Sequence, residues 1–173
     1  RAIFRHFRAG EPPSFKGEHY QFTLSNPFFN PGPIEGVETV PIYLAAVNSY
    51  NCRLAGELAE GVRMHPLNSP SYLREVIRPA VAEGAAKAGR RLEDIDFAIN
   101  PFFVTGATEE EFQESKELIR KHISFYAATR TYSAVMEHHG LGEVCAELVR
   151  LSQAGRWDDM PALVSDEMLE TFA

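Results

Sequence analysis

The sequence predicts an α/β protein in which strands and helices alternate along the middle of the chain. Residues 40–47 form a continuous apolar run, as expected of a strand covered on both faces in a parallel sheet. Residues 49–60 then place apolar side chains at helical spacing, and the same alternation of strand and helix follows twice more. Short β-α-β units of this kind give parallel strands joined by right-handed crossovers.

Three parallel strands leave two unpaired sheet edges, which a native protein must cover or close. A (β/α)8 barrel removes both edges by closure, but it typically needs about 250 residues, and this sequence has 173. We therefore predict a partial (β/α)8 TIM barrel with parallel strands, right-handed crossover helices and a helix-rich C-terminal part, forming a single domain over residues 1–173. A small, complete three-layer α/β protein is the alternative.

Before the first of these strands, residues 1–39 predict three features in order. A helix ends near residue 9, with Gly10 as its C-cap. Alternating apolar and polar residues then predict a short hairpin around Lys16-Gly17. A loop rich in proline, glycine and asparagine completes the segment.

Residues 40–106 predict a β-α-β-α-β core, and Pro79 should kink its second helix. Residues 107–173 predict a helical region whose first helix starts at a capping box formed by Thr108 and Glu111. The expected strands centre on residues 42–46, 62–65 and 97–104. The expected helices of the last region cover residues 109–127, 131–139, 142–154 and 162–172.

Composition excludes several classes of function. The formal net charge of −7 argues against a nucleic-acid partner, whose phosphates require clustered lysine and arginine. No apolar run approaches the roughly 20 residues that span a membrane, and no signal peptide is recognisable. Cys52 and Cys145 fit no metal-binding spacing and are expected to be buried free thiols. A cytoplasmic location follows from this use of cysteine.

An Asn-Ser step at residues 48–49 joins the first strand of the core to its helix. In parallel sheets, ligands bind where strands end and the next helices begin. Asn48 or Ser49 can cap the helix, which leaves its first backbone N–H groups available to an anion such as phosphate. Simple capping without a ligand explains the same two residues, so both interpretations remain open.

The second strand contributes two further polar side chains. Alternation along residues 62–65 places Val62 and Met64 on one face, and Arg63 and His65 on the other. Since the apolar pair suits the helix layer, Arg63 and His65 should face the barrel axis, where His65 could bind a phosphate or act on a substrate. Pairing of Arg63 with an inward carboxylate, or a structural role for His65, is the alternative.

No metal site is expected. His138 and His139 are adjacent on a helix, so they face different ways, and no third ligand accompanies them. We interpret them as solvated histidines at a helix end. Arg130 and Tyr132, in a break between two helices, could reach the tail of a bound cofactor.

Residues 40–67, VPIYLAAVNSYNCRLAGELAEGVRMHPL, resemble the central signature of the luciferase-like flavin and deazaflavin oxidoreductases. That signature has a Pro-Ile-x-x-Ala-Ala strand, a cofactor-phosphate turn, a helix carrying R-x-A-G-x-x-A-(D/E)-G, and the next strand; Glu60 stands where Asp is commoner. Upstream, FKGEHYQF is similar to the family's F-x-G-x-x-Y hairpin. The downstream stretches DFAINPFFVTGATEEE, FYAATRTYSAVMEHHG and GRWDDMPALVSDEMLETFA resemble a subgroup assigned to the deazaflavin coenzyme F420 rather than to FMN.

The resemblance implies an oxidoreductase that transfers a hydride between F420 and a small organic substrate. An FMN-dependent monooxygenase, a non-catalytic flavin-binding relative and an inactive fragment are the alternatives. The resemblance also implies that the chain lacks an N-terminal half and a last strand. Because the acid/base residues are expected in that N-terminal half, no catalytic residue is assigned. A homodimer or higher oligomer is expected. The expected cofactor-binding residues are Ala46, Val47, Asn48, Ser49 and Tyr50, together with Arg63 and His65.

Overall fold

The computed structural model describes residues 1–30, 32–33, 35–36 and 40–173. The chain separates into two compact units, Arg1–Pro41 and Ile42–Ala173. Part of the predicted proline- and glycine-rich loop falls outside the described residues, and the single domain over residues 1–173 stays a prediction.

The first unit contains a helix and a hairpin. Helix α1 (Ala2–Ala9) ends at Gly10, which has a φ of 67° and donates its backbone N–H to the carbonyl of His6. Only glycine adopts this left-handed conformation without steric cost, which explains why the helix stops there. Strands β1 (Phe15–Lys16) and β2 (Gln21–Phe22) pair antiparallel and confirm the predicted hairpin. A short 3-10 helix, η1 (Pro27–Phe29), follows.

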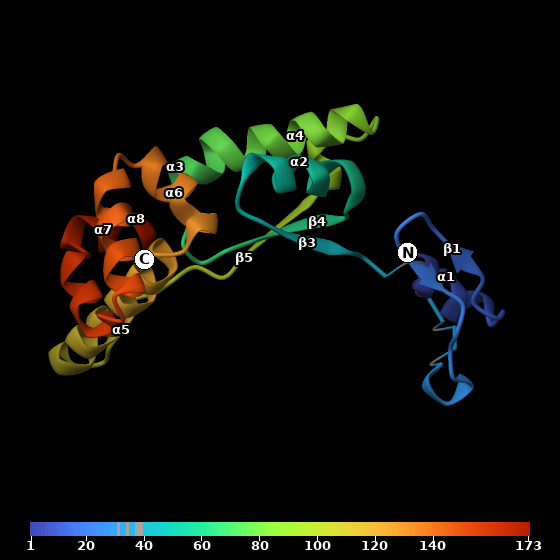
Figure 1. Cartoon of the computed structure of the whole chain (residues 1–173). Helices are drawn as coiled ribbons and strands as arrows, with labels where there is room; N and C mark the ends of the chain where they lie inside the picture. Colours follow the sequence, from blue (N-terminus) through green and yellow to red (C-terminus); the bar gives the residue numbers. More distant parts are fainter. Residues whose placement is uncertain (31, 34, 37–39) are drawn as a thin grey trace. The chain divides into compact units, whose positions relative to one another are not determined.

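The second unit is built on a three-stranded parallel sheet (Figure 1). Its strands β3 (Tyr43–Ala46), β4 (Gly61–Met64) and β5 (Asp96–Ile99) lie in that order, and both pairs are parallel, as predicted. The third strand is shorter than the predicted 97–104. The register pairs Ile99 with Met64, the last residue of β4, so residues beyond 99 have no partner in the described ladder. Pro101 also lacks the N–H that a ladder needs.

Helices α2 (Ser49–Leu58) and α4 (Arg78–Lys87) lie side by side over one face of this sheet (Figure 1). Between β4 and α4 the chain forms one turn of helix, α3 (Pro70–Tyr72), and a π-helical turn, η2 (Leu73–Ile77). The kink predicted at Pro79 stays a prediction; the structure shows a π turn that ends at Ile77, and Pro79 lies in the first turn of α4, where a missing N–H is tolerated. A short 3-10 helix, η3 (Leu92–Asp94), precedes β5.

The two faces of the sheet differ in exposure. Ala46, Val62 and Met64 are buried against the helices. Ala45 and Arg63, on the opposite face, are exposed. The alternation predicted for β4 is therefore confirmed for Val62, Arg63 and Met64, since successive strand residues point to opposite faces.

The C-terminal helices gather at the end of the sheet where the strands finish (Figure 1). Helix α5 (Glu109–Ala127) has the predicted bounds, and the capping box of Thr108 and Glu111 is formed. The next elements are η4 (Arg130–Tyr132), α6 (Ser133–His138) and α7 (Gly142–Gln153). The predicted helix 162–172 was wrong at its start: a 3-10 helix, η5 (Trp157–Leu163), comes first, and α8 (Asp166–Phe172) begins only after Ser165, which caps it.

Both cysteines are free and buried, as predicted. Burial raises the pKa of the Cys52 thiol to about 11, and it also raises the pKa of Cys145. In the described part of the chain, no helix combines the length and the apolar character needed to cross a bilayer.

Candidate functional site

The turn between β3 and α2 carries most of the residues that the sequence predicts to bind a cofactor. Asn48 is the N-cap of α2: its side-chain oxygen accepts the backbone N–H of Asn51 at 2.9 Å. Its backbone carbonyl accepts the N–H of Cys52 at 3.0 Å. The Asn48 side chain is therefore committed to the cap, and its role in the site is to shape the turn.

Three consecutive backbone N–H groups at this turn, those of Asn48, Ser49 and Tyr50, have no acceptor among the described residues. Ser49 is the first residue of α2, and Tyr50 is 70% exposed. A helix leaves its first N–H groups unpaired, and the helix dipole makes that end attractive to anions. Ala46 differs from its neighbours, because its side chain is buried in the core.

A buried tyrosine holds the carbonyl that precedes the turn. The hydroxyl of Tyr72, a residue 2% exposed, donates a hydrogen bond to the backbone carbonyl of Val47 at 3.1 Å. This contact joins α3, which follows β4, to the end of β3. Tyr72 was not identified from the sequence, since nothing in the local pattern distinguishes it from an ordinary core aromatic residue.

His65 lies one residue beyond the end of β4, in an aromatic environment. Its ring is 4.4 Å from that of Tyr126 and 4.2 Å from that of Tyr132, measured between centroids. Its Nδ1 accepts the backbone N–H of Leu67 at 3.0 Å, which assigns the proton of the neutral ring to Nε2. Burial lowers the pKa of His65, so the ring is neutral at physiological pH. Within the described chain, Nε2 has no hydrogen-bonding partner.

Arg63 extends from the exposed face of β4. With the Asn100 amide oriented to satisfy both groups, its oxygen accepts a hydrogen bond from the Arg63 guanidinium at 2.8 Å. The partner of Arg63 is thus an amide from the residue after β5. Asn100 was not identified from the sequence.

The strand register brings these groups to one edge of the sheet. Ala46 is paired with Met64, and Met64 with Ile99. The residues that follow each strand, Val47 to Tyr50, His65 and Asn100, consequently emerge at the same carboxyl edge. Arg130, which the sequence suggested for a cofactor tail, is exposed, whereas Tyr132 packs on His65.

The two adjacent histidines were wrongly interpreted as solvated. Both are half-buried: His139 Nε2 lies 2.8 Å from the Ser69 hydroxyl, and His138 Nε2 lies 3.6 Å from a Glu75 carboxylate oxygen. These two contacts connect the end of α6 to the segment after β4, two regions that are distant in the sequence. No cluster of three or more metal-binding side chains occurs among the described residues.

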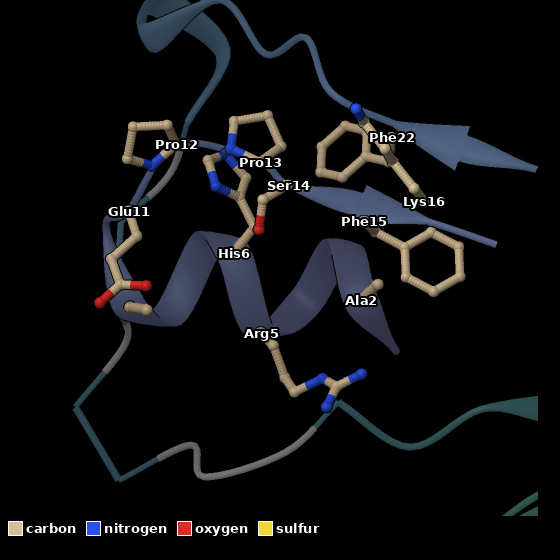
Figure 2. A pocket seen from close by; sticks show the side chains of 11 residues that line it. Ala2, Arg5, His6, Glu11, Pro12, Pro13, Ser14, Phe15, Lys16 and Phe22 are labelled. Atoms are coloured by element: carbon tan, nitrogen blue, oxygen red, sulfur yellow. The ribbon is translucent and has the colours of Figure 1, made fainter.

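A separate cavity of about 420 Å³ lies within the first unit (Figure 2). It is lined by α1, the segment that follows it and both strands of the hairpin, and the His6 side chain projects from α1 toward Ser14. The His6 ring also packs edge-on against Phe22, at 5.4 Å between centroids. None of the residues predicted to bind a cofactor lines this cavity.

Comparison with known proteins identifies the family. The sequence profile described as luciferase-like monooxygenase matches residues 1–173. The chain belongs to this family. It is 36% identical over 173 residues to an uncharacterized protein of Mycobacterium tuberculosis, a match that covers 100% of this chain and 51% of that protein.

Two further relatives are named for their dependence on F420. An F420-dependent glucose-6-phosphate dehydrogenase of Nakamurella multipartita is 34% identical over 87 residues, covering 50% of this chain and 24% of that protein. The solved structure of a coenzyme F420 dependent tetrahydromethanopterin reductase from Methanopyrus kandleri superimposes with a TM-score of 0.76 at 26% identity, covering 99% of this chain and 47% of the reductase. The chain spans about half the length of the Mycobacterium tuberculosis protein and of the reductase.

Proposed function

We propose that this chain forms part of an F420-dependent oxidoreductase of the luciferase-like family and that its β3–α2 turn binds the phosphate of the cofactor. One observation carries the proposal: the unpaired backbone N–H groups of Asn48, Ser49 and Tyr50 follow one another at a helix N-terminus, on the carboxyl edge of a parallel sheet. Such a group of donors fits a phosphate. The F420-dependent relatives favour F420 over other phosphate-bearing cofactors.

When bound, the deazaflavin ring supplies the hydride chemistry, and the protein binds and orients it. In this proposal Asn48 holds the turn in shape, while Ser49 and Tyr50 offer backbone N–H groups, and Ser49 its hydroxyl, to the phosphate. Ala45 is exposed on the open face and has only a methyl side chain, so it leaves room for a ligand close to the backbone. No residue of this chain is assigned as a general acid or base.

Arg63 and His65 contribute polar groups to the open side of the same edge. Arg63 supplies a positive charge near Asn100. His65 is neutral and can donate one hydrogen bond from Nε2, because Nδ1 is occupied by Leu67. Both are suited to bind oxygen atoms of the cofactor or of a small organic substrate.

FMN is the second cofactor to consider, since the matching profile is described as that of a monooxygenase. The test is to titrate F420 and FMN separately against the whole protein and to follow the cofactor's absorbance or fluorescence. Saturable binding of F420, followed by turnover of reduced or oxidised F420 with candidate substrates, is expected. Tighter binding of FMN would reassign the cofactor. Binding of F420 without turnover would indicate a non-catalytic relative, and failure to bind either would contradict the proposal.

We also propose that the whole protein self-associates as a homodimer or larger oligomer. The outer edges of β3 and β5 have no strand partner among the described residues, and an unpaired edge is a site where another element or chain can pack. Sedimentation velocity of the whole protein tests this, and a single species with the mass of one chain would contradict it.

A further inference from the structure

The hydrogen bond between Tyr72 and Val47 has a directional consequence for the turn. A trans peptide is planar, and its C=O and N–H groups point in opposite directions. The described chain contains no cis peptide bond. Since the Tyr72 hydroxyl binds the Val47 carbonyl, the N–H of Asn48, which belongs to the same peptide unit, must point away from Tyr72.

Tyr72 is buried in the hydrophobic core. The Asn48 N–H therefore points away from this buried hydroxyl, and it is the first of the three unpaired donors. Without the Tyr72 hydroxyl, the Val47 carbonyl would be free to rotate toward water, and the N–H of Asn48 would rotate with it.

Tyr72 is itself held rigidly. Its backbone N–H donates to the Ser69 hydroxyl at 3.0 Å, as part of the cap of α3. The same hydroxyl contacts His139 at 2.8 Å, and the Tyr72 ring packs edge-on against His138 with centroids 5.3 Å apart. Burial raises the pKa of the Tyr72 phenol, so the group remains protonated and able to donate. A fixed donor of this kind preorganises the group that it contacts.

We propose that Tyr72 is a positioning residue for cofactor binding: its hydroxyl fixes the Val47–Asn48 peptide so that the N–H groups of the β3–α2 turn face the phosphate. This inference rests on the proposed function of the turn. Tyr72 itself does not touch the cofactor. Its effect is to remove the need for the peptide to reorient when the ligand binds, and such preorganisation raises affinity.

The test is Tyr72→Phe in the whole protein, which deletes one oxygen atom and keeps the ring. Affinity is measured for F420 and for its deazaflavin chromophore without the phosphate. Tyr72→Phe should weaken F420 binding by roughly tenfold, the effect expected from losing one buried hydrogen bond. Affinity for the phosphate-free chromophore should change less than about twofold, since it does not use the turn. Melting of the ligand-free protein checks that the variant is folded.

The matched control is Tyr43→Phe. It deletes the same atom from a tyrosine at the opposite end of β3, where the hydroxyl donates to Asp96. The Tyr43→Phe variant should bind F420 with the same affinity as the wild type. Should Tyr72→Phe fail to fold, Ser69→Ala is the second arm, because it loosens the cap that holds Tyr72 but retains the tyrosine hydroxyl; a smaller loss, again specific to F420, is expected.

The outcomes separate the two proposals. A wild type that binds neither F420 nor FMN overturns the proposed function, and the positioning role with it. A wild type that binds F420, with Tyr72→Phe binding equally well, overturns the positioning role alone. An equal loss of affinity for F420 and for the phosphate-free chromophore also overturns it, since that would be a general structural defect.

Discussion

The imidazole of His65 lies against the ring of Tyr132, with 4.2 Å between centroids and 33° between the ring planes. Tyr126 contacts the same imidazole from α5, so two C-terminal elements enclose the residue that follows β4. This enclosure partly desolvates His65, and it lowers the pKa of the imidazole in the folded state. Burial also lowers the pKa of His139, and the nearby His138 lowers it further, whereas Glu75 opposes the shift.

These shifts predict how stability depends on pH. A histidine whose folded pKa is depressed binds fewer protons in the folded state than in the unfolded state. The stability that such a histidine contributes is fully present above the pKa of the unfolded state, near 6.5. It is lost as the pH falls from there toward the lower pKa of the folded state. We expect the free energy of unfolding, measured with urea, to fall as the pH drops below about 6.5.

Substitution of His65 tests whether this residue causes part of the pH dependence of the free energy of unfolding. His65→Gln should reduce the loss of stability on acidification, because the variant has one fewer group that gains a proton on unfolding. His19→Gln, at a well-exposed histidine of the first unit, is the comparison, and its slope should differ from that of the wild type by less than the slope of His65→Gln does. Equal slopes for His65→Gln and the wild type would contradict the prediction.

The second prediction concerns Ser49. Ser49→Glu places a fixed negative charge at the first position of α2, where the phosphate is proposed to bind. Binding of F420 should weaken by roughly tenfold or more, because two negative charges would compete for the same donors. Stability should change by less than about 0.5 kcal/mol, since a carboxylate is well tolerated at a helix N-terminus.

Ser49→Gln is the matched control for this variant, because it has nearly the same size without the charge. It loses the proposed hydroxyl contact but keeps the backbone donors, so its affinity for F420 should lie between those of the wild type and Ser49→Glu. If Ser49→Glu and the wild type bind F420 and FMN equally well, the turn is a helix cap without a ligand.

The third prediction concerns the close approach of α2 and α4. A methyl group added at Gly84 would lie 1.9 Å from the carbonyl oxygen of Arg53, and one added at Gly56 would lie 2.1 Å from that of Val81. Because the atoms in contact belong to the backbones of α2 and α4, an added methyl group fits only if the two helices move apart. Gly84→Ala should therefore destabilise the fold by about 3 kcal/mol in urea unfolding. Its control, Gly142→Ala at the start of α7, meets no atom closer than 3.9 Å and should be neutral or slightly stabilising.

The fourth prediction concerns the thiols. With a pKa of about 11, fewer than about one Cys52 side chain in a hundred is a thiolate at pH 8. Cys145 is also buried, and its thiol donates to the carbonyl of Ala127 at 3.2 Å. Both cysteines should resist alkylation by iodoacetamide in the folded protein and react once it is unfolded in urea. Mass spectrometry counts the adducts, and rapid labelling of either cysteine in the folded protein would contradict its burial.

Much of the fold was predictable, because local physical chemistry specifies it. Gly10 ends α1 through its left-handed conformation, and Thr108 and Glu111 define the start of α5 by capping it. The apolar run before Asn48 marks a strand, and Asn48 itself caps the helix that follows. Elements were mispredicted where tertiary partners decide the outcome, as for β5, which ends where β4 ends, and for the start of α8.

The candidate site was only partly predictable for the same reason. The sequence by itself determined the order of the elements, a helix cap at the Asn48-Ser49 step and the side of β4 on which Arg63 lies, since each depends on residues close together in the chain. Only the tertiary structure decided that Tyr72 binds the carbonyl of Val47, 25 residues away, and that Tyr126 and Tyr132 enclose His65. Contacts between distant residues depend on how the sheet and helices pack, and no periodicity or short motif encodes that packing.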